Sequence, residues 1–257
     1  MKRVITLRLS AIVLVALTSI SVVYAQVPDD YHHPHFGVKV GINISGLTGD
    51  IGPFDRNSPN YNNSPFAGAV GEPYFSVNAG ITVDYRISKA FSFASELLYN
   101  ERGGSYSIER DDIIITDTDG TQSNGHDHYA YQLSYIEMPL ILQYHLPTQS
   151  TDASYRIYAG ISPAIRISAS TAYTYYTDPV TQDTNTDVGK VNYSQGFTVN
   201  PIAGFWVSSK DLGHGLKIFG DMRFEYSFSN IFERRQVDNQ NLQTDMWTIN
   251  FGFGVRF

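Results

Sequence analysis

The polar stretch 109–128 holds the first residues whose types could perform chemistry. A histidine close to carboxylates can activate water for hydrolysis, and Asp111, Asp112, His126 and Asp127 all lie in this stretch. An outer-face hydrolase is therefore one hypothesis. The chain shows no Ser-His-carboxylate order of the kind that acyl-transfer enzymes use, so we predict no catalytic residues and a protein that is not an enzyme.

The same stretch suggests calcium, because Asp117 and Asp119 carry the carboxylate oxygens that suit this hard cation. An EF-hand loop that began at Asp117 would place a glycine at position 122 and a bidentate glutamate at position 128. Those positions hold Gln122 and His128. The motif fails, and we expect a solvated loop with weak cation binding as the alternative.

Three histidines near the amino terminus are the next candidate, in the segment Tyr31-His-His-Pro-His-Phe36. Clustered imidazoles can bind a transition metal. The segment also contains Pro34 and precedes the first predicted strand, which is typical of a flexible lead-in. We therefore predict no metal site and no cofactor.

Charged side chains recur on the polar face of segments whose other face is apolar. Positive and negative members nearly balance, and a buried charge is tolerated when it is paired and hydrogen-bonded. We predict that these charges form a network inside the folded domain and block the lumen that its strands enclose. A gated ion path through the same charges is the alternative. The members are Lys39, Asp84, Arg86, Glu96, Glu137, Arg156, Arg166, Asp221, Arg223, Glu225 and Arg256.

Strands must position these charges, because apolar and polar residues alternate with a period of two. Eight segments show this alternation, and the frame of the fourth shifts near Tyr135, as a β-bulge would cause. The predicted strands are residues 36–45, 75–87, 91–102, 129–146, 155–169, 191–207, 216–228 and 246–257.

The last strand shows the alternation most clearly. Its odd-numbered positions from Trp247 to Phe257 are aromatic or aliphatic, whereas the positions between them are small, polar or charged. An apolar outer face fits a barrel that contacts lipid. A soluble barrel with its apolar face inward is the alternative, but eight strands enclose too little space for so many aromatic side chains. We predict an all-β fold, an eight-stranded antiparallel transmembrane up-and-down β-barrel with a polar interior.

The amino terminus has the features of a secretory signal peptide. Three basic residues precede an apolar run, and the small residue Ala25 fits a cleavage site. We expect residues 1–25 to be cleaved, residues 26–35 to form a periplasmic lead-in, and residues 36–257 to form the barrel domain.

Composition agrees with a barrel in lipid. Charged residues make up 17% of the chain, below the roughly 25% of soluble domains, and aromatic residues reach 14%. Removal of the signal peptide would change the net charge from −7 to 15 − 25 = −10. A net negative charge argues against nucleic acid as a partner.

Connections between the predicted strands alternate between short and long. Outer-membrane barrels pair short periplasmic turns with longer extracellular loops. We therefore predict a place in the bacterial outer membrane, with long loops extracellular and both termini periplasmic. The long connections are residues 47–74, 103–128, 172–190 and 229–245.

Several segments resemble the PorT-like outer-membrane β-barrel family of Bacteroidetes-type bacteria. Gly37–Leu47 is similar to the family's opening strand, where Gly-x-x-x-Gly-x-Asn-x-Ser is usual, and Tyr135–Tyr144 carries Tyr-x-Glu-x-Pro before an apolar run. Tyr158–Pro163 and Phe224–Ile231 resemble two later strands. The resemblance implies the barrel fold over most of residues 36–257. One lineage of the family takes part in type IX secretion, but most members are uncharacterised.

The expected function is a non-enzymatic structural or interaction role in the cell envelope, with a link to protein secretion that the resemblance suggests. Alternatives are a narrow outer-membrane pore and an outer-face hydrolase that acts on lipid or peptide. Expected partners are outer-membrane lipid, envelope or secretion proteins, and the barrel-assembly machinery, for which the terminal Phe257 would serve as the signal.

Overall fold

A computed structural model describes eleven stretches of the chain, all of which belong to the unit His32–Phe257. The predicted signal peptide and most of the predicted lead-in lie outside the described residues. The described residues are 34–49, 70–116, 120, 122–148, 153–176, 184–190, 196–213, 215–228, 236–237, 240–241 and 244–257.

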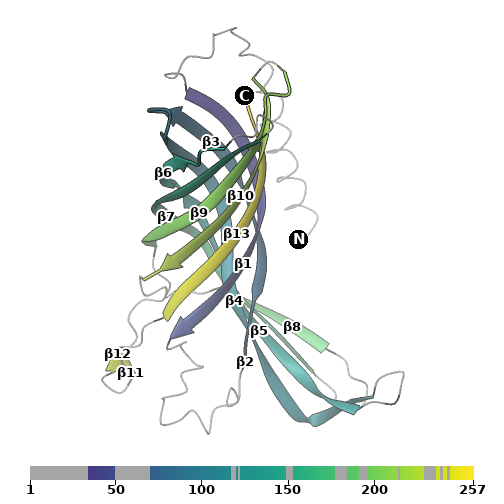
Figure 1. Ribbon diagram of the computed structural model, residues 1–257. Coiled ribbons are helices and arrows are strands. Elements are labelled where there is room, and N and C mark those ends of the chain that lie inside the picture. The colour runs from purple at the N-terminus through teal and green to yellow at the C-terminus, as the bar shows by residue number, and fades with distance from the viewer. Residues whose placement is uncertain are drawn as a thin grey trace. The chain divides into compact units, whose positions relative to one another are not determined.

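Every regular element in these stretches is a β-strand (Figure 1). No helix among them is long and apolar enough to cross a membrane. The strands are β1 (Pro34–Gly49), β2 (Val70–Glu72), β3 (Tyr74–Arg86), β4 (Phe91–Thr116), β5 (Gln122–Glu137), β6 (Leu140–His145), β7 (Ala153–Tyr176), β8 (Thr184–Lys190), β9 (Phe197–Ser209), β10 (Lys217–Ser227), β11 (Gln236–Val237), β12 (Gln240–Asn241) and β13 (Thr244–Arg256).

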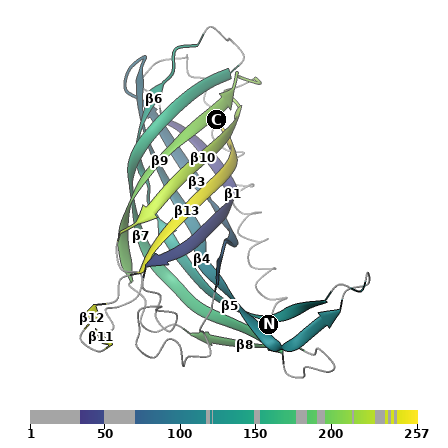
Figure 2. The same cartoon turned by 60° about the horizontal axis from the view of Figure 1, so that its bottom comes forward.

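The main sheet closes on itself. Antiparallel pairs run from β4 through β3, β1, β13, β10, β9 and β7 to β5, and β5 pairs with β4 again. The first and last strands pair over thirteen positions, from Gly37 with Arg256 to Gly49 with Thr244. The result is an antiparallel β-barrel in which chain neighbours are mostly sheet neighbours, as Figures 1 and 2 show.

The barrel has two distinct ends. At the turn end, short connections join β3 to β4, β6 to β7 and β9 to β10, and Phe257 exchanges backbone hydrogen bonds with Phe36. In the tight turn before β10, Gly213 and Gly215 adopt φ angles of +118° and +82°, where a side chain would be strained. The opposite end, with longer connections, is the loop end.

The predicted fourth strand is divided into β5 and β6. The register between β5 and β7 shifts between Ser134 and Tyr135, at the position where a bulge was predicted, but the extra residue is Ile167 on β7 rather than a residue of β5. Met138 and Pro139 interrupt the strand, and proline lacks the N–H that a continuous ladder requires. Accessory strands β2, β8, β11 and β12 were not predicted.

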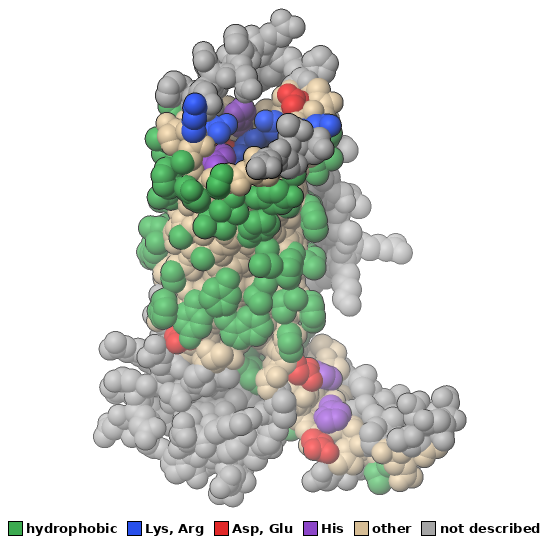
Figure 3. Space-filling view, viewed as in Figure 1, with side chains coloured by type: hydrophobic (Ala, Val, Ile, Leu, Met, Phe, Trp, Pro, Cys, Tyr) green, Lys and Arg blue, Asp and Glu red, His purple; other side chains and the backbone are tan. Residues whose placement is uncertain are grey.

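Apolar side chains cover the outside of the barrel (Figure 3). Val40, Ile81, Leu97 and Phe253 are each at least half exposed, whereas the residues that alternate with them point inward. This finding contradicts the soluble alternative, in which the apolar face would point inward. An exposed apolar belt of this size is stable when lipid covers it.

Three strands continue past the barrel at the loop end, which corrects two predicted loops. Residues 103–128 were predicted as a loop, but β4 extends to Thr116 and β5 begins at Gln122. Residues 172–190 contain the end of β7 and all of β8. These extensions of β4, β5 and β7, with β2 and β8 at the edges, form a projecting sheet (Figure 2). Its charged and polar composition conceals the alternation of buried Tyr106 and Ile108 with less buried neighbours.

Two clusters of buried apolar side chains lie along the barrel, and the one toward the loop end continues onto the projecting sheet with Tyr106 and Ile108. Tyr106, Tyr131, Leu133, Tyr135 and Met246 belong to the cluster toward the loop end. The cluster toward the turn end consists of Ala94, Ile141, Tyr158, Ile202, Trp206 and Phe219. Its largest members stack, with the ring centroids of Trp206 and Phe219 4.1 Å apart.

Candidate functional site: the charged barrel interior

Nine of the eleven predicted network residues are buried inside the barrel, each with at most 5% of its surface exposed. They are Lys39, Asp84, Glu96, Glu137, Arg156, Asp221, Arg223, Glu225 and Arg256. Alternation along the strands places them there. Side chains two residues apart on a strand point to the same side, and at these positions that side faces the lumen. The charges divide into three clusters along the barrel.

The other two predicted residues are half-buried. Arg86 lies at the turn end, where its guanidinium donates to the backbone oxygens of Ser88 and Lys89 at 3.2 and 3.3 Å. Arg166 lies on β7 in register with Tyr135, at the bulge. Arg166 lies in the same alternation frame as Arg156 and Ala164, and the frame of β7 changes only after it.

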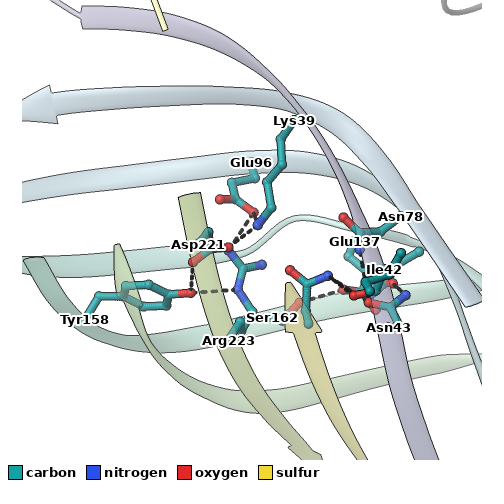
Figure 4. A network of polar contacts seen from close by, with 12 residues as sticks. Lys39, Ile42, Asn43, Asn78, Glu96, Glu137, Tyr158, Ser162, Asp221 and Arg223 are labelled. Carbon is teal, nitrogen blue, oxygen red and sulfur yellow. Dashed lines mark hydrogen bonds and ion pairs between the residues drawn. The ribbon is translucent and has the colours of Figure 1, made fainter. Parts of the chain in front are cut away.

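The central cluster joins Lys39, Glu96, Asp221 and Arg223 (Figure 4). The Lys39 ammonium pairs with Asp221 and lies 3.7 Å from the Glu96 carboxylate. Arg223 Nη2 donates to Glu96 Oε2 at 2.8 Å. The Tyr158 hydroxyl donates to Asp221 and accepts from Arg223 Nε at 3.2 Å. Two positive and two negative charges therefore cancel within this cluster.

The cluster toward the loop end depends on Arg102, which the sequence analysis missed. Arg102 pairs with both Glu137 and Glu225, and its guanidinium carbon lies 4.6 Å from the Tyr135 ring centroid. Asn100 donates to Glu137 at 2.9 Å. Arg102 follows Glu96 by six residues in the same inward frame and is the last residue of the predicted strand 91–102, so alternation alone could have found it.

The cluster at the turn end joins two arginines to one carboxylate. Arg156 Nη1 donates to Asp84 Oδ2 at 2.7 Å, and Arg256 Nη1 donates to the same oxygen. Arg156 Nη1 also donates to Gln143 Oε1 at 2.6 Å. Positive charge exceeds negative charge in this cluster by one.

A belt of asparagines lies between the central cluster and the cluster toward the loop end (Figure 4). Asn43 Oδ1 accepts from Asn78 at 3.0 Å and from Asn250 at 2.9 Å, while its amide donates to Asn100 at 2.7 Å. These bonds connect β1, β3, β4 and β13 through side chains as well as through the sheet. Buried amides with fixed partners favour one packed arrangement of the interior.

Several ion pairs cross the lumen. Around the closed sheet, β4 and β10 are separated by three strands on either side, so they face each other. Arg102 of β4 pairs with Glu225 of β10, and Glu96 of β4 pairs with Arg223 of β10. Side chains from opposite walls thus meet at two levels. Chemically, this arrangement can hold the barrel closed and cancel the charges it buries.

A family comparison agrees with this architecture. The sequence pattern of the family described as "Outer membrane protein beta-barrel domain" matches residues 24–233 of the chain. The chain belongs to this family. Its place is therefore the outer membrane. No curated protein matches the chain in sequence.

Several solved outer-membrane proteins are similar to this chain at low identity and low TM-score. OprG of Pseudomonas aeruginosa is 9% identical, with a TM-score of 0.42, over 88% of this chain and 97% of OprG. Ail, the attachment invasion locus protein of Yersinia pestis, is 9% identical, with a TM-score of 0.35, over 88% of this chain and 99% of Ail. AlkL is 12% identical, with a TM-score of 0.43, over 91% of this chain and 95% of AlkL.

The residues of the hydrolase, calcium and histidine hypotheses lie apart from one another or outside the described residues. His126 is exposed and the adjacent Asp127 is buried, where it accepts a hydrogen bond from Tyr173 at 3.0 Å. The two side chains lie on opposite faces of β5, so His126 and Asp127 do not face one common site. Asp117 and Asp119 lie outside the described residues, as do His32 and His33. Among the described residues, no group of three or more potential ligands could hold a metal ion.

Proposed function

We propose that this protein is a non-conducting, non-enzymatic outer-membrane barrel that presents its projecting sheet to a partner at the cell surface. The barrel anchors the sheet in the membrane, and the interior network keeps the anchor closed and rigid. The role is structural or interactive, within the cell envelope.

The ion pairs that cross the lumen carry this proposal. A conducting path needs a continuous column of water, but Arg102 and Glu225 meet across the lumen, and so do Glu96 and Arg223. Each of these four side chains is at most 3% exposed. A buried charge that loses its partner costs about 3–5 kcal/mol, so these pairs favour a lumen that stays closed.

The strand order supports an eight-stranded barrel. Treating β5 and β6 as one wall segment leaves β1, β3, β4, β7, β9, β10 and β13 as the other seven. An eight-stranded barrel has an interior that side chains can fill. The buried charged side chains and the apolar clusters of the described residues can fill an interior of this size.

The projecting sheet is the proposed contact surface. Two tyrosines lie side by side on neighbouring strands, because Tyr129 of β5 is in register with Tyr173 of β7, and both side chains are half-buried. The ring centroids of Tyr129 and Tyr173 are 5.8 Å apart. Tyrosine gives large, rigid contact area at low entropic cost, and it is frequent in binding surfaces. A link to protein secretion stays a prediction from the sequence resemblance.

Single-channel recording tests the closed lumen. The purified barrel in planar bilayers should produce no conductance steps, and the variant Glu96→Ala/Arg223→Ala/Asp221→Ala/Lys39→Ala should produce small steps, because its central cluster is removed. The matched control is Lys89→Ala, which changes an exposed charge at a turn and should stay silent.

Regular conductance steps from the unchanged protein would favour the pore instead. In that case Glu137→Ala should alter the conductance, since Glu137 lies in the lumen beside Arg102. Steps that Glu137→Ala leaves unchanged would point to a path outside the lumen and would reject the pore as predicted.

A further inference from the structure

Two histidines lie side by side on one face of the projecting sheet. His126 and His128 are both exposed, and one residue separates them on β5. Residues two apart on a strand point to the same face, about 6–7 Å apart along the strand. Asp127 between them points to the opposite face, where it is buried. A stretch that the sequence predicts as a loop is therefore a strand that presents two imidazoles together.

Carboxylates from two other strands lie beside this pair. Glu109 of β4 is exposed and lies opposite His126 in register, where the two Cβ atoms of such a pair are about 4.5–5.5 Å apart. Glu72 of β2 approaches His128, with Glu72 Oε2 3.4 Å from His128 Nδ1. Figure 3 shows His side chains next to acidic side chains on the projecting sheet. The histidine pair thus lies between two negative charges, which favour a cation as ligand.

The contact with Glu72 prepares His128 to bind a metal ion. A carboxylate beside one ring nitrogen favours the tautomer that carries its proton there, and the other nitrogen then offers its lone pair. Because Glu72 faces Nδ1, the nitrogen available to a ligand is Nε2. Histidines that bind metal ions commonly have such a carboxylate partner, which fixes the orientation of the ring. The side chain of His128 is 54% exposed, so a hydrated ion can reach it.

We propose that His126 and His128 together bind a divalent transition-metal ion such as Zn²⁺ or Ni²⁺. Imidazole nitrogen suits these ions, and it binds them at about 2.0–2.1 Å. Because His126 is exposed, rotation about its side-chain bonds can bring its ring to the ion that His128 Nε2 binds. No three potential ligands converge on one point in the part of the chain that the structure describes. The protein therefore supplies two ligands, and water fills the other positions.

Titration of Ni²⁺ into the purified barrel, without a histidine tag, tests the site by calorimetry. The unchanged protein should show saturable binding. His126→Ala and His128→Ala should each weaken it about tenfold or more, because even a residue that only hydrogen-bonds to a metal ligand changes the affinity about 10–100-fold. Glu72→Gln should weaken binding less than either histidine variant. All three residues lie on the surface of the sheet, so the variants should fold.

A spacing control separates the pair from two independent histidines. The variant His128→Ala/Ala130→His keeps two histidines on the same face of β5 but places them about 13 Å apart. At that separation the two rings cannot bind one ion. The spacing control should therefore bind Ni²⁺ as weakly as His128→Ala does.

Four results would overturn the proposal. The first is the absence of saturable binding to the unchanged protein. The second is binding that survives unchanged in His126→Ala/His128→Ala, which would assign the ion to other residues such as His32 and His33. The third is a spacing control that binds as tightly as the unchanged protein.

The fourth is Ca²⁺ binding as tight as that of Ni²⁺ and equally sensitive to Glu72→Gln, because a hard cation prefers carboxylate oxygen to imidazole nitrogen. The titration depends neither on conductance nor on the orientation of the barrel. Its failure is therefore distinct from a failure of the proposed function.

Discussion

At the scale of single residues, Arg102 connects the interior most directly. Its side chain is 1% exposed, and it pairs with Glu137 on β5 and Glu225 on β10. Burial of three charges is costly, and their mutual attraction with added hydrogen bonds offsets that cost. The contribution of Arg102 is therefore best measured by its removal.

Arg102→Met should lower the free energy of unfolding by about 3–5 kcal/mol, because it leaves two buried carboxylates without their cation. Urea unfolding of the barrel in lipid vesicles measures the loss. Lys89→Met, at an exposed turn, is the matched control and should change the stability little.

The added changes Glu137→Gln and Glu225→Gln separate charge from volume. They should restore part of the stability lost in Arg102→Met, since neutral amides need no cation. A loss in Arg102→Met no larger than that of Lys89→Met would contradict the assigned role.

At the scale of elements, the projecting sheet is the feature that most distinguishes this barrel from a plain ring of strands. It extends β4, β5 and β7 beyond the loop end and adds β2 and β8 at its edges. Val188 on β8 is 75% exposed, at an edge that is paired only with β7 among the described strands. The proposed orientation places this sheet outside the cell.

Cysteine labelling tests that orientation, because the chain contains no cysteine of its own. A maleimide too large to cross the outer membrane should label Val188→Cys in intact cells. It should label Lys89→Cys, at a turn-end connection, only after the outer membrane is permeabilised. The reverse pattern would mean that the barrel is inserted the other way round.

At the scale of the whole molecule, the apolar belt defines where lipid contacts the barrel. Ile81 lies near the middle of β3 and is 50% exposed. Its neighbours in register, Leu97 on β4 and Val38 on β1, belong to the same outer surface. Residues on the projecting sheet, by contrast, contact water in the proposed orientation.

Ile81→Arg should cost about 2–4 kcal/mol of stability in vesicles, as expected for a charge facing lipid near the bilayer midplane. Val188→Arg changes an apolar residue of higher exposure and should cost close to nothing. Unfolding titrations of both variants in the same lipid measure the difference. Equal costs would show that the membrane boundary lies elsewhere.

Much of the fold followed from alternation, because a strand in a barrel wall has one face in lipid and one in the lumen. The last strand illustrates this, with Thr248 and Asn250 buried and Phe253 exposed. Prediction was wrong in the stretch 103–128, where charged and hydroxyl residues outnumber apolar ones. There, pairing of β4 with β5 and of β5 with β7 continues the sheet beyond the belt, and pairing is not visible in local composition.

The sequence by itself determined which side chains face inward, since the period of two is a property of each strand alone. It placed Lys39 and Asp221 on the polar frame of their strands without indicating that they meet. Only the tertiary structure decided the partners, because residues 182 positions apart come together through closure and register of the sheet. The same closure brings Arg156 and Arg256, from two different strands, to one carboxylate, that of Asp84.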